Sequence, residues 1–337
     1  MSKKNIKKVT PKKIPADSAK FKPMTSEDLI DVLGTTIRED NSNKLITFLA
    51  ELSAYTENSQ LNISFNAPSS SGKSYIPTEI AKLFPEEDLI QLAYCSPTAF
   101  FHDRAQGYNK ETNTLLVDLS RKIMIFLDQP HTLLLHHLRP LLSHDKKEML
   151  LKITDAGQKG GLRTKNVLLS GFPSVIFCSA NLKIDEQEST RFILLSPETN
   201  DEKIREGVRI KIEKDADGVA FRQKLDADPK RKLLRERIAA IKAAHIDDVK
   251  IPHSQDIMQK FFEGVKRLKP RHQRDIGRIL SLIKAFALLN LWFREKNGSI
   301  LLAADTDVEE RVRGVEPLTS PWKGDVIPLY NTRDVVI

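Results

Sequence analysis

The 337-residue sequence predicts an α/β fold, in which a largely parallel sheet is followed by an all-helical domain. Between residues 61 and 195, short apolar runs bounded by polar turns alternate with helical stretches. The first of these runs leads into a loop that ends in Gly-Lys-Ser and then into a helical pattern. From about residue 200 the chain is highly charged, and helical periodicity continues to residue 312.

A basic N-terminal tail holds nearly all of the formal net charge of +8. Residues 1–24 contain eight lysines and one aspartate, a net of +7, and the rest of the chain has 45 basic and 44 acidic residues, a net of +1. Such a tail contacts nucleic acid non-specifically in some proteins, and a solubilising leader explains it equally well. No apolar stretch follows these lysines, and no run approaches the ~20 residues that span a bilayer. We therefore expect a cytoplasmic protein with no membrane partner.

The elements are expected in the following order. Residues 25–57 predict two helices, the second within KLITFLAELSAY. Six runs then predict strands buried in the sheet: LNISFN, LIQLAYC, TLLVDL, KIMIFLD, SVIFCSA and RFILLS. The two cysteines, Cys95 and Cys178, lie in such runs, which predicts buried free thiols without a disulfide framework or a zinc site. Residues 201–250 predict a charged helical connector, and residues 251–337 a helical domain with a C-terminal tail.

The segment APSSSGKS, residues 67–74, predicts a phosphate-binding loop because a strand pattern precedes it and a helix pattern follows it. Backbone N–H groups in such a loop point at phosphate oxygens. Lys73 would reach the β and γ phosphates of ATP, and the Ser74 hydroxyl would ligate Mg²⁺. Ala67 stands where the pattern usually has its first glycine. The expected nucleotide-binding residues are Pro68, Ser69, Ser70, Ser71, Gly72, Lys73 and Ser74.

Polar residues that follow later strands complete the expected site. Asp128 ends KIMIFLD and would hold the hydrated magnesium, and the next residue, Gln129, orients water but cannot take a proton. Asn181 ends SVIFCSAN and would lie beside the γ phosphate, because ligands bind at the carboxyl ends of parallel strands. An amide that caps a turn is the alternative for Asn181. Arg191 precedes the last run, and an ion pair with Glu188 is its alternative.

In this order, APSSSGKS, IMIFLDQ, VIFCSAN and STRFILL resemble the Walker A, Walker B, sensor 1 and arginine-finger motifs of AAA+ ATPases. The chain is most similar to the branch with a pre-sensor-1 hairpin, which contains minichromosome maintenance and superfamily 3 helicases and related ATPases of bacterial mobile elements and phages. The resemblance covers about residues 45–310. It implies a three-layer P-loop AAA+ domain over residues 25–200, a helical lid, and Arg191 as a finger that acts on a neighbouring subunit. RDIGRILSLIKAFALL resembles the lid helix with sensor 2, which falls on Arg274; a surface arginine paired with a nearby aspartate is the alternative.

The resemblance also implies a hairpin between Walker B and sensor 1, where KITDAGQKGGLRTKNVLLSGFP lies. Lys159, Arg163 and Lys165, which we call the hairpin cations, cluster there without an intervening acid. A ring of such hairpins would present cations to a phosphate chain in a central pore. An ordinary solvated basic loop is the alternative. No aromatic residue precedes Phe172 in the segment, so base stacking is not indicated.

Three functions are consistent with these motifs. The leading one is a ring-forming helicase or translocase that uses ATP and Mg²⁺ on single-stranded nucleic acid, with DNA expected, in the replication of a mobile element or phage. A primase or another replication protein would be its partner. The second is an AAA+ loader or remodeller of a protein partner. The third is a scaffold gated by nucleotide binding with little turnover, which Gln129 and Ala67 favour.

Overall fold

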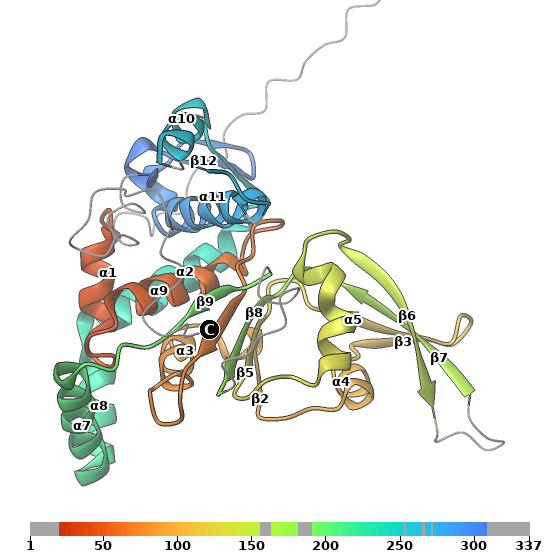
Figure 1. The fold of residues 1–337 in the computed structure, drawn as a ribbon, viewed down its shortest axis with the longest axis horizontal. Coiled ribbons are helices and arrows are strands. Elements are labelled where there is room, and N and C mark those ends of the chain that lie inside the picture. The colour runs from red at the N-terminus through yellow and green to blue at the C-terminus, as the bar shows by residue number, and fades with distance from the viewer. Residues whose placement is uncertain are drawn as a thin grey trace, which may run out of the picture.

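The computed structural model describes residues 20–155, 163–180, 191–252, 254–264, 267–270 and 272–308. Its centre is a five-stranded sheet in which all strands are parallel, which confirms the α/β class (Figure 1). In spatial order the strands are β2 (Leu89–Leu92), β5 (Ile123–Phe126), β8 (Ser174–Ser179), β1 (Ile63–Asn66) and β9 (Ile193–Leu195).

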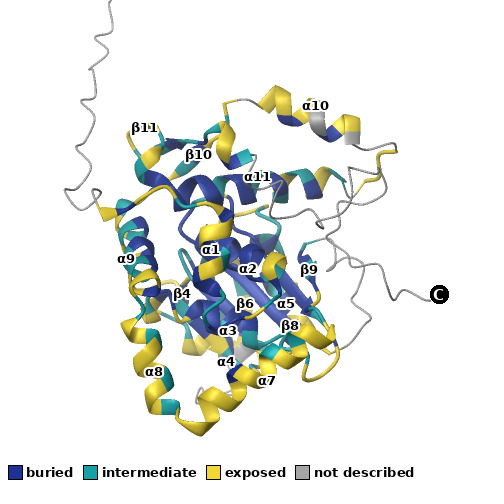
Figure 2. Ribbon diagram, turned by 90° about the vertical axis from the view of Figure 1, so that its left-hand side faces the viewer, coloured by how far each residue is buried: buried dark blue, intermediate teal, exposed yellow. Residues whose placement is uncertain are grey.

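The inner strands are apolar on both faces, as expected for a parallel sheet that is covered on both sides. In β5, Ile123 and Ile125 belong to one core, whereas Met124 and Phe126 belong to a second core on the opposite face. The sheet is therefore the middle layer of three, and its two strands β5 and β8 are buried throughout, as Figure 2 shows for β8.

Helices from both ends of the chain cover the first face. The first core joins this face to α1 (Ser26–Leu33), α2 (Asn41–Ser53), α3 (Tyr75–Ala81), α9 (Pro229–Ala244) and α11 (His272–Leu289). The capping box of Thr25 and Asp28 begins α1. Leu234 and Ile238 of α9 are fully buried in this core, so the last helix of the expected connector is part of the main body.

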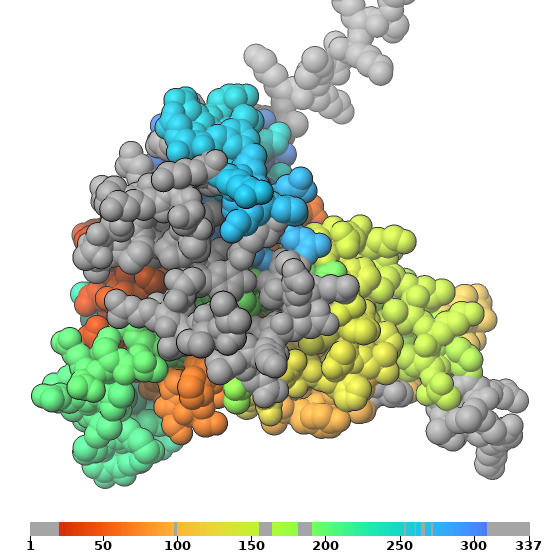
Figure 3. All heavy atoms as spheres, in the orientation of Figure 1, coloured from red at the N-terminus to blue at the C-terminus, as the bar shows by residue number. Residues whose placement is uncertain are grey.

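The second face is covered by α4 (Pro97–Asp103), α5 (Thr132–Leu142) and a second sheet. That sheet has the order β3 (Gly107–Asn109), β4 (Thr114–Asp118), β7 (Arg163–Ser170) and β6 (Glu148–Asp155). Its strands β6 and β7 pair antiparallel between β5 and β8 in the sequence, so a hairpin lies where the resemblance implies one. The second sheet projects from one side of the body (Figures 1 and 3).

The run TLLVDL was expected in the main sheet, and this prediction is wrong, because it forms β4 of the second sheet. Its burial explains the difference. Leu115 and Val117 are buried, whereas Leu116 between them is exposed. This alternation is typical of a sheet that is covered on one face.

The C-terminal region contains more than helices. The expected helices are present as α7 (Asp201–Ala216), α8 (Gly218–Ala227), α9 and α10 (Ser254–Gly264). However, β10 (Asp248–Lys250), β12 (Ile300–Leu302) and β11 (Lys296–Asn297) form a three-stranded sheet, with β12 in the middle. The prediction of an all-helical domain is therefore wrong. Two single 3₁₀ turns, Glu86–Asp88 and Leu291–Phe293, complete the regular structure.

The last residues of the predicted tail pack on the body. The Phe21 side chain is 4% exposed and contacts the Trp292 ring, and the Arg237 guanidinium lies over both rings. The Met24 N–H donates to the Asn290 side chain at 2.8 Å, and that side chain donates to the Met24 carbonyl at 2.9 Å. The expected flexible tail of residues 1–24 is thus wrong for its last five residues, and residues 1–19 lie outside the described part.

The two cysteines differ in burial. Cys178 is buried in β8, as expected, whereas Cys95 follows β2 and is half-buried. Burial raises the pKa of the Cys178 thiol to about 12. Among the described helices, none combines the length and the apolar character needed to cross a bilayer.

Candidate nucleotide-binding site

The predicted phosphate loop, Ala67–Ser74, connects the carboxyl end of β1 to the start of α3. Its backbone takes two positive φ angles, +66° at Ser70 and +89° at Gly72. A glycine adopts such an angle at no steric cost, which explains Gly72 in this position. The strand, loop and helix follow one another as the motif predicts.

Hydrogen bonds hold the phosphate loop against its own lysine and against β8. The Lys73 ammonium donates to the Ala67 carbonyl at 3.2 Å and to the Pro68 carbonyl at 3.3 Å. The Ala67 N–H donates to the Ser179 carbonyl at 3.3 Å, and the Cys178 thiol donates to the Lys73 carbonyl at 3.4 Å. The Lys73 ammonium therefore lies at the mouth of the loop, where a phosphate would contact it.

Asp128 and Gln129 lie at the same edge of the sheet. They directly follow Leu127 at the carboxyl end of β5, and β8 separates β5 from β1. Neighbouring strands are about 5 Å apart, so Asp128 is about 10 Å from the β1 backbone. The Ser179 hydroxyl at the end of β8 donates to the Gln129 carboxamide at 3.4 Å, which connects the two motifs. Asn181, two residues later, lies outside the described residues.

The residues present fit a hydrated magnesium ion. The Asp128 carboxylate is exposed and accepts a hydrogen bond from the Gln129 N–H at 2.7 Å, and the Ser74 side chain is half-buried at the end of the loop. Magnesium usually keeps several waters and takes one or two protein ligands besides phosphate, so a gap between Ser74 and Asp128 is compatible with its chemistry. Within the described ranges, no cluster of three or more histidine, cysteine or acidic residues forms an all-protein metal site.

His131 does not supply the general base that Gln129 lacks. Its Nδ1 accepts the Leu133 N–H at 3.1 Å and thereby caps α5. In a neutral imidazole the proton is then on Nε2, so the free ring nitrogen donates rather than accepts. His131 is therefore not placed as a proton acceptor at this edge of the sheet.

A cavity of about 600 Å³ lies beside the phosphate loop. Its walls come from three segments: residues 36–40, the loop itself with the start of α3, and α7. Ile37, Ile204 and Val208 make part of the wall apolar, whereas Lys203 and Lys214 bring positive charge. A volume of this size is typical of a small-molecule site.

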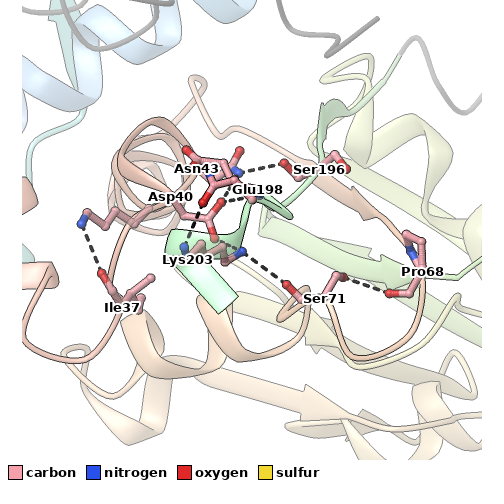
Figure 4. A network of polar contacts seen from close by, with 10 residues as sticks. Ile37, Asp40, Asn43, Pro68, Ser71, Ser196, Glu198 and Lys203 are labelled. Carbon is pink, nitrogen blue, oxygen red and sulfur yellow. Dashed lines mark hydrogen bonds and ion pairs between the residues drawn. The ribbon is translucent and has the colours of Figure 1, made fainter. Parts of the chain in front are cut away.

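A polar network at one end of this cavity was not predicted from the sequence (Figure 4). Asp40 is fully buried, and its Oδ1 accepts from the Asn43 side chain at 2.9 Å and from the Glu198 N–H at 2.7 Å. Its Oδ2 forms an ion pair with Lys203, whose ammonium also donates to the Ser71 carbonyl at 3.3 Å. The start of α7 is thus fixed to the phosphate loop. Lys203 lies in a run of mixed charges, and no sequence signal distinguishes it from its neighbours.

Two neighbouring groups have shifted pKa values. Burial lowers the pKa of Lys44 to about 8, although nearby Glu39 and Asp40 favour the charged form, and its ammonium donates to the Ile37 carbonyl at 3.1 Å. Burial also raises the pKa of Glu198, and the Asp40 carboxylate raises it further.

Arg191 lies at the opposite edge of the sheet from the phosphate loop of its own chain. Strands β9 and β1 are parallel, and Ile193 pairs with Ile63. Continued two residues backwards, this register puts Arg191 level with Leu61, which precedes β1. At about 3.3 Å per residue, the loop begins about 20 Å further along the sheet. The Arg191 Nε donates to the Ser143 hydroxyl at 2.8 Å. The alternative partner Glu188 lies outside the described residues.

Arg274 does not line the cavity either. It is exposed near the start of α11, and the described residues around the cavity include none from that helix. The structure thus brings the phosphate loop, Asp128 and Gln129 together, and places Arg191 and Arg274 elsewhere on the same chain.

The predicted nucleic-acid contact lies on the projecting hairpin. Arg163 begins β7, the Lys165 ammonium lies 5.4 Å from the centre of the Tyr108 ring, and Lys159 falls outside the described residues. Tyr108 comes from β3 and is 47% exposed. The segment of the hairpin cations has no aromatic residue before Phe172, but β3 of the same sheet brings the Tyr108 ring to Lys165.

No family model matches this chain, and no curated protein sequence is significantly similar to it.

Proposed function

We propose that this protein is an AAA+ ATPase that assembles into a ring and uses ATP hydrolysis to move along single-stranded DNA. The observation that supports this proposal most strongly is the convergence of the phosphate loop, Asp128 and Gln129 at the carboxyl edge of one parallel sheet. Ligands of open α/β sheets bind at this edge. The adjacent cavity of about 600 Å³ has room for the base and ribose of a nucleotide.

In this proposal each residue has a defined task. The loop N–H groups and Lys73 contact the phosphates, and Ser74 and Asp128 hold magnesium, which neutralises charge on the β and γ phosphates when bound. Gln129, held by Ser179, orients the attacking water. Asn181 follows β8, the strand between these motifs, and contacts the γ phosphate. The apolar side chains of Ile37 and Ile204 border the base.

Two observations support assembly from several subunits. Arg191 is about 20 Å along the sheet from its own phosphate loop, so it serves as a finger only for a neighbouring subunit. Large apolar side chains also surround the Asp128 edge: Tyr94 is 72% exposed, Leu133 49% and Leu127 39%. Exposed apolar groups next to a charged site are typical of a surface that a partner covers. Arg274, which the resemblance assigns to sensor 2, does not line the cavity of its own chain.

The hairpin supports a nucleic-acid substrate. It projects from the body, and one of its cations, Lys165, lies beside the exposed Tyr108 ring of β3. Proteins that hold single strands use this combination, because cations contact the phosphates while aromatic rings stack on bases. Strand displacement tests the proposal: the wild-type protein with Mg²⁺ and ATP should release a labelled oligonucleotide from a partly single-stranded duplex. Lys73→Ala should not release it, and equal release by Lys73→Ala would contradict the proposal.

One observation favours the protein-remodelling function instead. Val208 and Ile212 on α7 and Val219 on α8 are exposed apolar residues on the helical hairpin opposite the second sheet (Figures 1 and 2). A protein partner would cover them. The two functions differ in the effect of the hairpin cations: their replacement by alanine should abolish DNA-stimulated turnover in a translocase and leave it unchanged in a remodeller.

A further inference from the structure

We infer that Lys203 is a second phosphate-contacting cation of the nucleotide site, and that Asp40 is the carboxylate it leaves when a triphosphate binds. This inference rests on the proposed function. It adds to the phosphate loop a residue from α7, which lies 130 positions after Lys73 (203 minus 73) and belongs to no recognised motif.

The position of the Lys203 ammonium is the first observation. It lies 3.3 Å from the Ser71 carbonyl oxygen and 4.0 Å from the point where a Cβ atom on Gly72 would lie. The Lys73 ammonium contacts the carbonyls of Ala67 and Pro68 in the same loop. Two lysine ammonium groups therefore contact the backbone of the phosphate loop, Lys73 at its start and Lys203 at its middle.

The environment of Lys203 is the second observation. Its side chain is 14% exposed and pairs with the buried Asp40 carboxylate (Figure 4). A bound phosphate would compete for the ammonium with both the Asp40 carboxylate and the Ser71 carbonyl, and its oxygens carry negative charge as the carboxylate does. Asn43 and the Glu198 N–H donate to Oδ1 and keep the carboxylate in place, and Oδ2 is the oxygen that Lys203 would leave.

The attachment of α7 gives this exchange a consequence. Within the described part of the chain, Ile210 is the one buried residue of α7. Two lysines around the cavity also connect α7 to the body: Lys203 at its start, and near its end Lys214, which lies over the Tyr75 ring and 3.9 Å from Glu79. If the Lys203 ammonium moves from Asp40 to a bound phosphate, the position of α7 therefore depends on whether nucleotide is bound.

Equilibrium titration with a fluorescent ATP analogue and Mg²⁺ tests the inference. Lys203→Met should weaken binding about 10- to 100-fold, the usual range for a hydrogen bond to a charged group. Lys203→Arg should restore binding to within about threefold of wild type, since it keeps the cation. Asp40→Asn should strengthen binding, because Lys203 loses the competing carboxylate.

Arg209→Met is the matched control, because Arg209 lies on the same helix, pairs with Glu206 and is not among the residues that line the cavity. Its affinity should stay within about twofold of wild type. If Lys203 were structural, Lys203→Met and Asp40→Asn would weaken binding equally and lower the melting temperature equally, which would overturn the inference. Should Asp40→Asn not fold, equal affinity of Lys203→Met and Lys203→Arg overturns it. A wild-type protein that binds no ATP overturns the proposed function itself.

Discussion

Subunits with Arg191→Ala and subunits with Lys73→Ala should each be inactive alone and regain ATP turnover when mixed. The sheet register puts Arg191 about 20 Å from the phosphate loop of its own chain, so a complete site needs two subunits. Loss of an arginine finger lowers turnover by about 1,000-fold or more. Arg191→Ala should leave ATP binding nearly unchanged, because the phosphate loop is intact.

The recovered activity follows from simple counting. In an equal mixture, half of the subunits keep Lys73, and half of their neighbours keep Arg191. About one quarter of the interfaces in a cyclic assembly are then complete, whatever the number of subunits. Steady-state phosphate release should therefore recover to about one quarter of the wild-type rate per subunit, provided that subunits exchange before the assay.

The matched control replaces the Lys73→Ala subunit with one that carries both substitutions. No interface in that mixture has both residues, so the mixture should stay inactive. If the mixture of single variants were no more active than this control, Arg191 would not act on a neighbouring subunit, and its hydrogen bond to Ser143 would be its role.

Three further predictions concern the hairpin and two buried charges. Alanine at all three hairpin cations should weaken single-stranded DNA binding and flatten its salt dependence in a chain that lacks residues 1–19, and no change would contradict a phosphate contact. Glu51 is fully buried, and burial raises its pKa well above 4.5. As the pH rises, the unfolded chain therefore loses the Glu51 carboxyl proton before the folded chain does, which lowers the free energy of unfolding. Glu51→Gln has no such proton, so it should be more stable than wild type at pH 7 and not at pH 4. In chemical denaturation the difference should grow by about 1.4 kcal/mol per pH unit between these values. The pKa of Lys44 is lowered from 10.5 to about 8. Between pH 8 and 10.5 the Lys44 ammonium is protonated in the unfolded chain and largely deprotonated in the folded one. The free energy of unfolding of the wild type should therefore rise by about 1.4 kcal/mol per pH unit relative to that of Lys44→Met, and the same pH dependence in both proteins would refute this.

The sequence predicted the strands of the main sheet because buried parallel strands are apolar on both faces, as in IMIF of β5. It predicted the phosphate loop because strand, Gly-Lys-Ser and helix occur together. The alternation that distinguishes β4 from the main strands is one of burial and not of polarity, because the exposed Leu116 is itself apolar, so the sequence does not show it.

Other features depend on tertiary contacts and leave little trace in the sequence. The strands β10 and β12 have three residues each, too few for a periodic pattern, so the helical stretches around them dominated the prediction. Phe21 stands among the lysines of the basic segment, and the sequence does not show that its side chain packs against Trp292. The pairing of Lys203 with Asp40 joins residues 163 positions apart (203 minus 40), which no local pattern reports.

Phosphate release from Mg²⁺ and ATP, with and without single-stranded DNA, tests the central claim most directly. We predict measurable release by the wild-type protein, several-fold faster release with DNA, and none with Lys73→Ala. The melting temperature of Lys73→Ala should stay within a few degrees of wild type, because Lys73 contacts loop carbonyls rather than the core. ATP binding without release under either condition would contradict the motor and favour the nucleotide-gated scaffold.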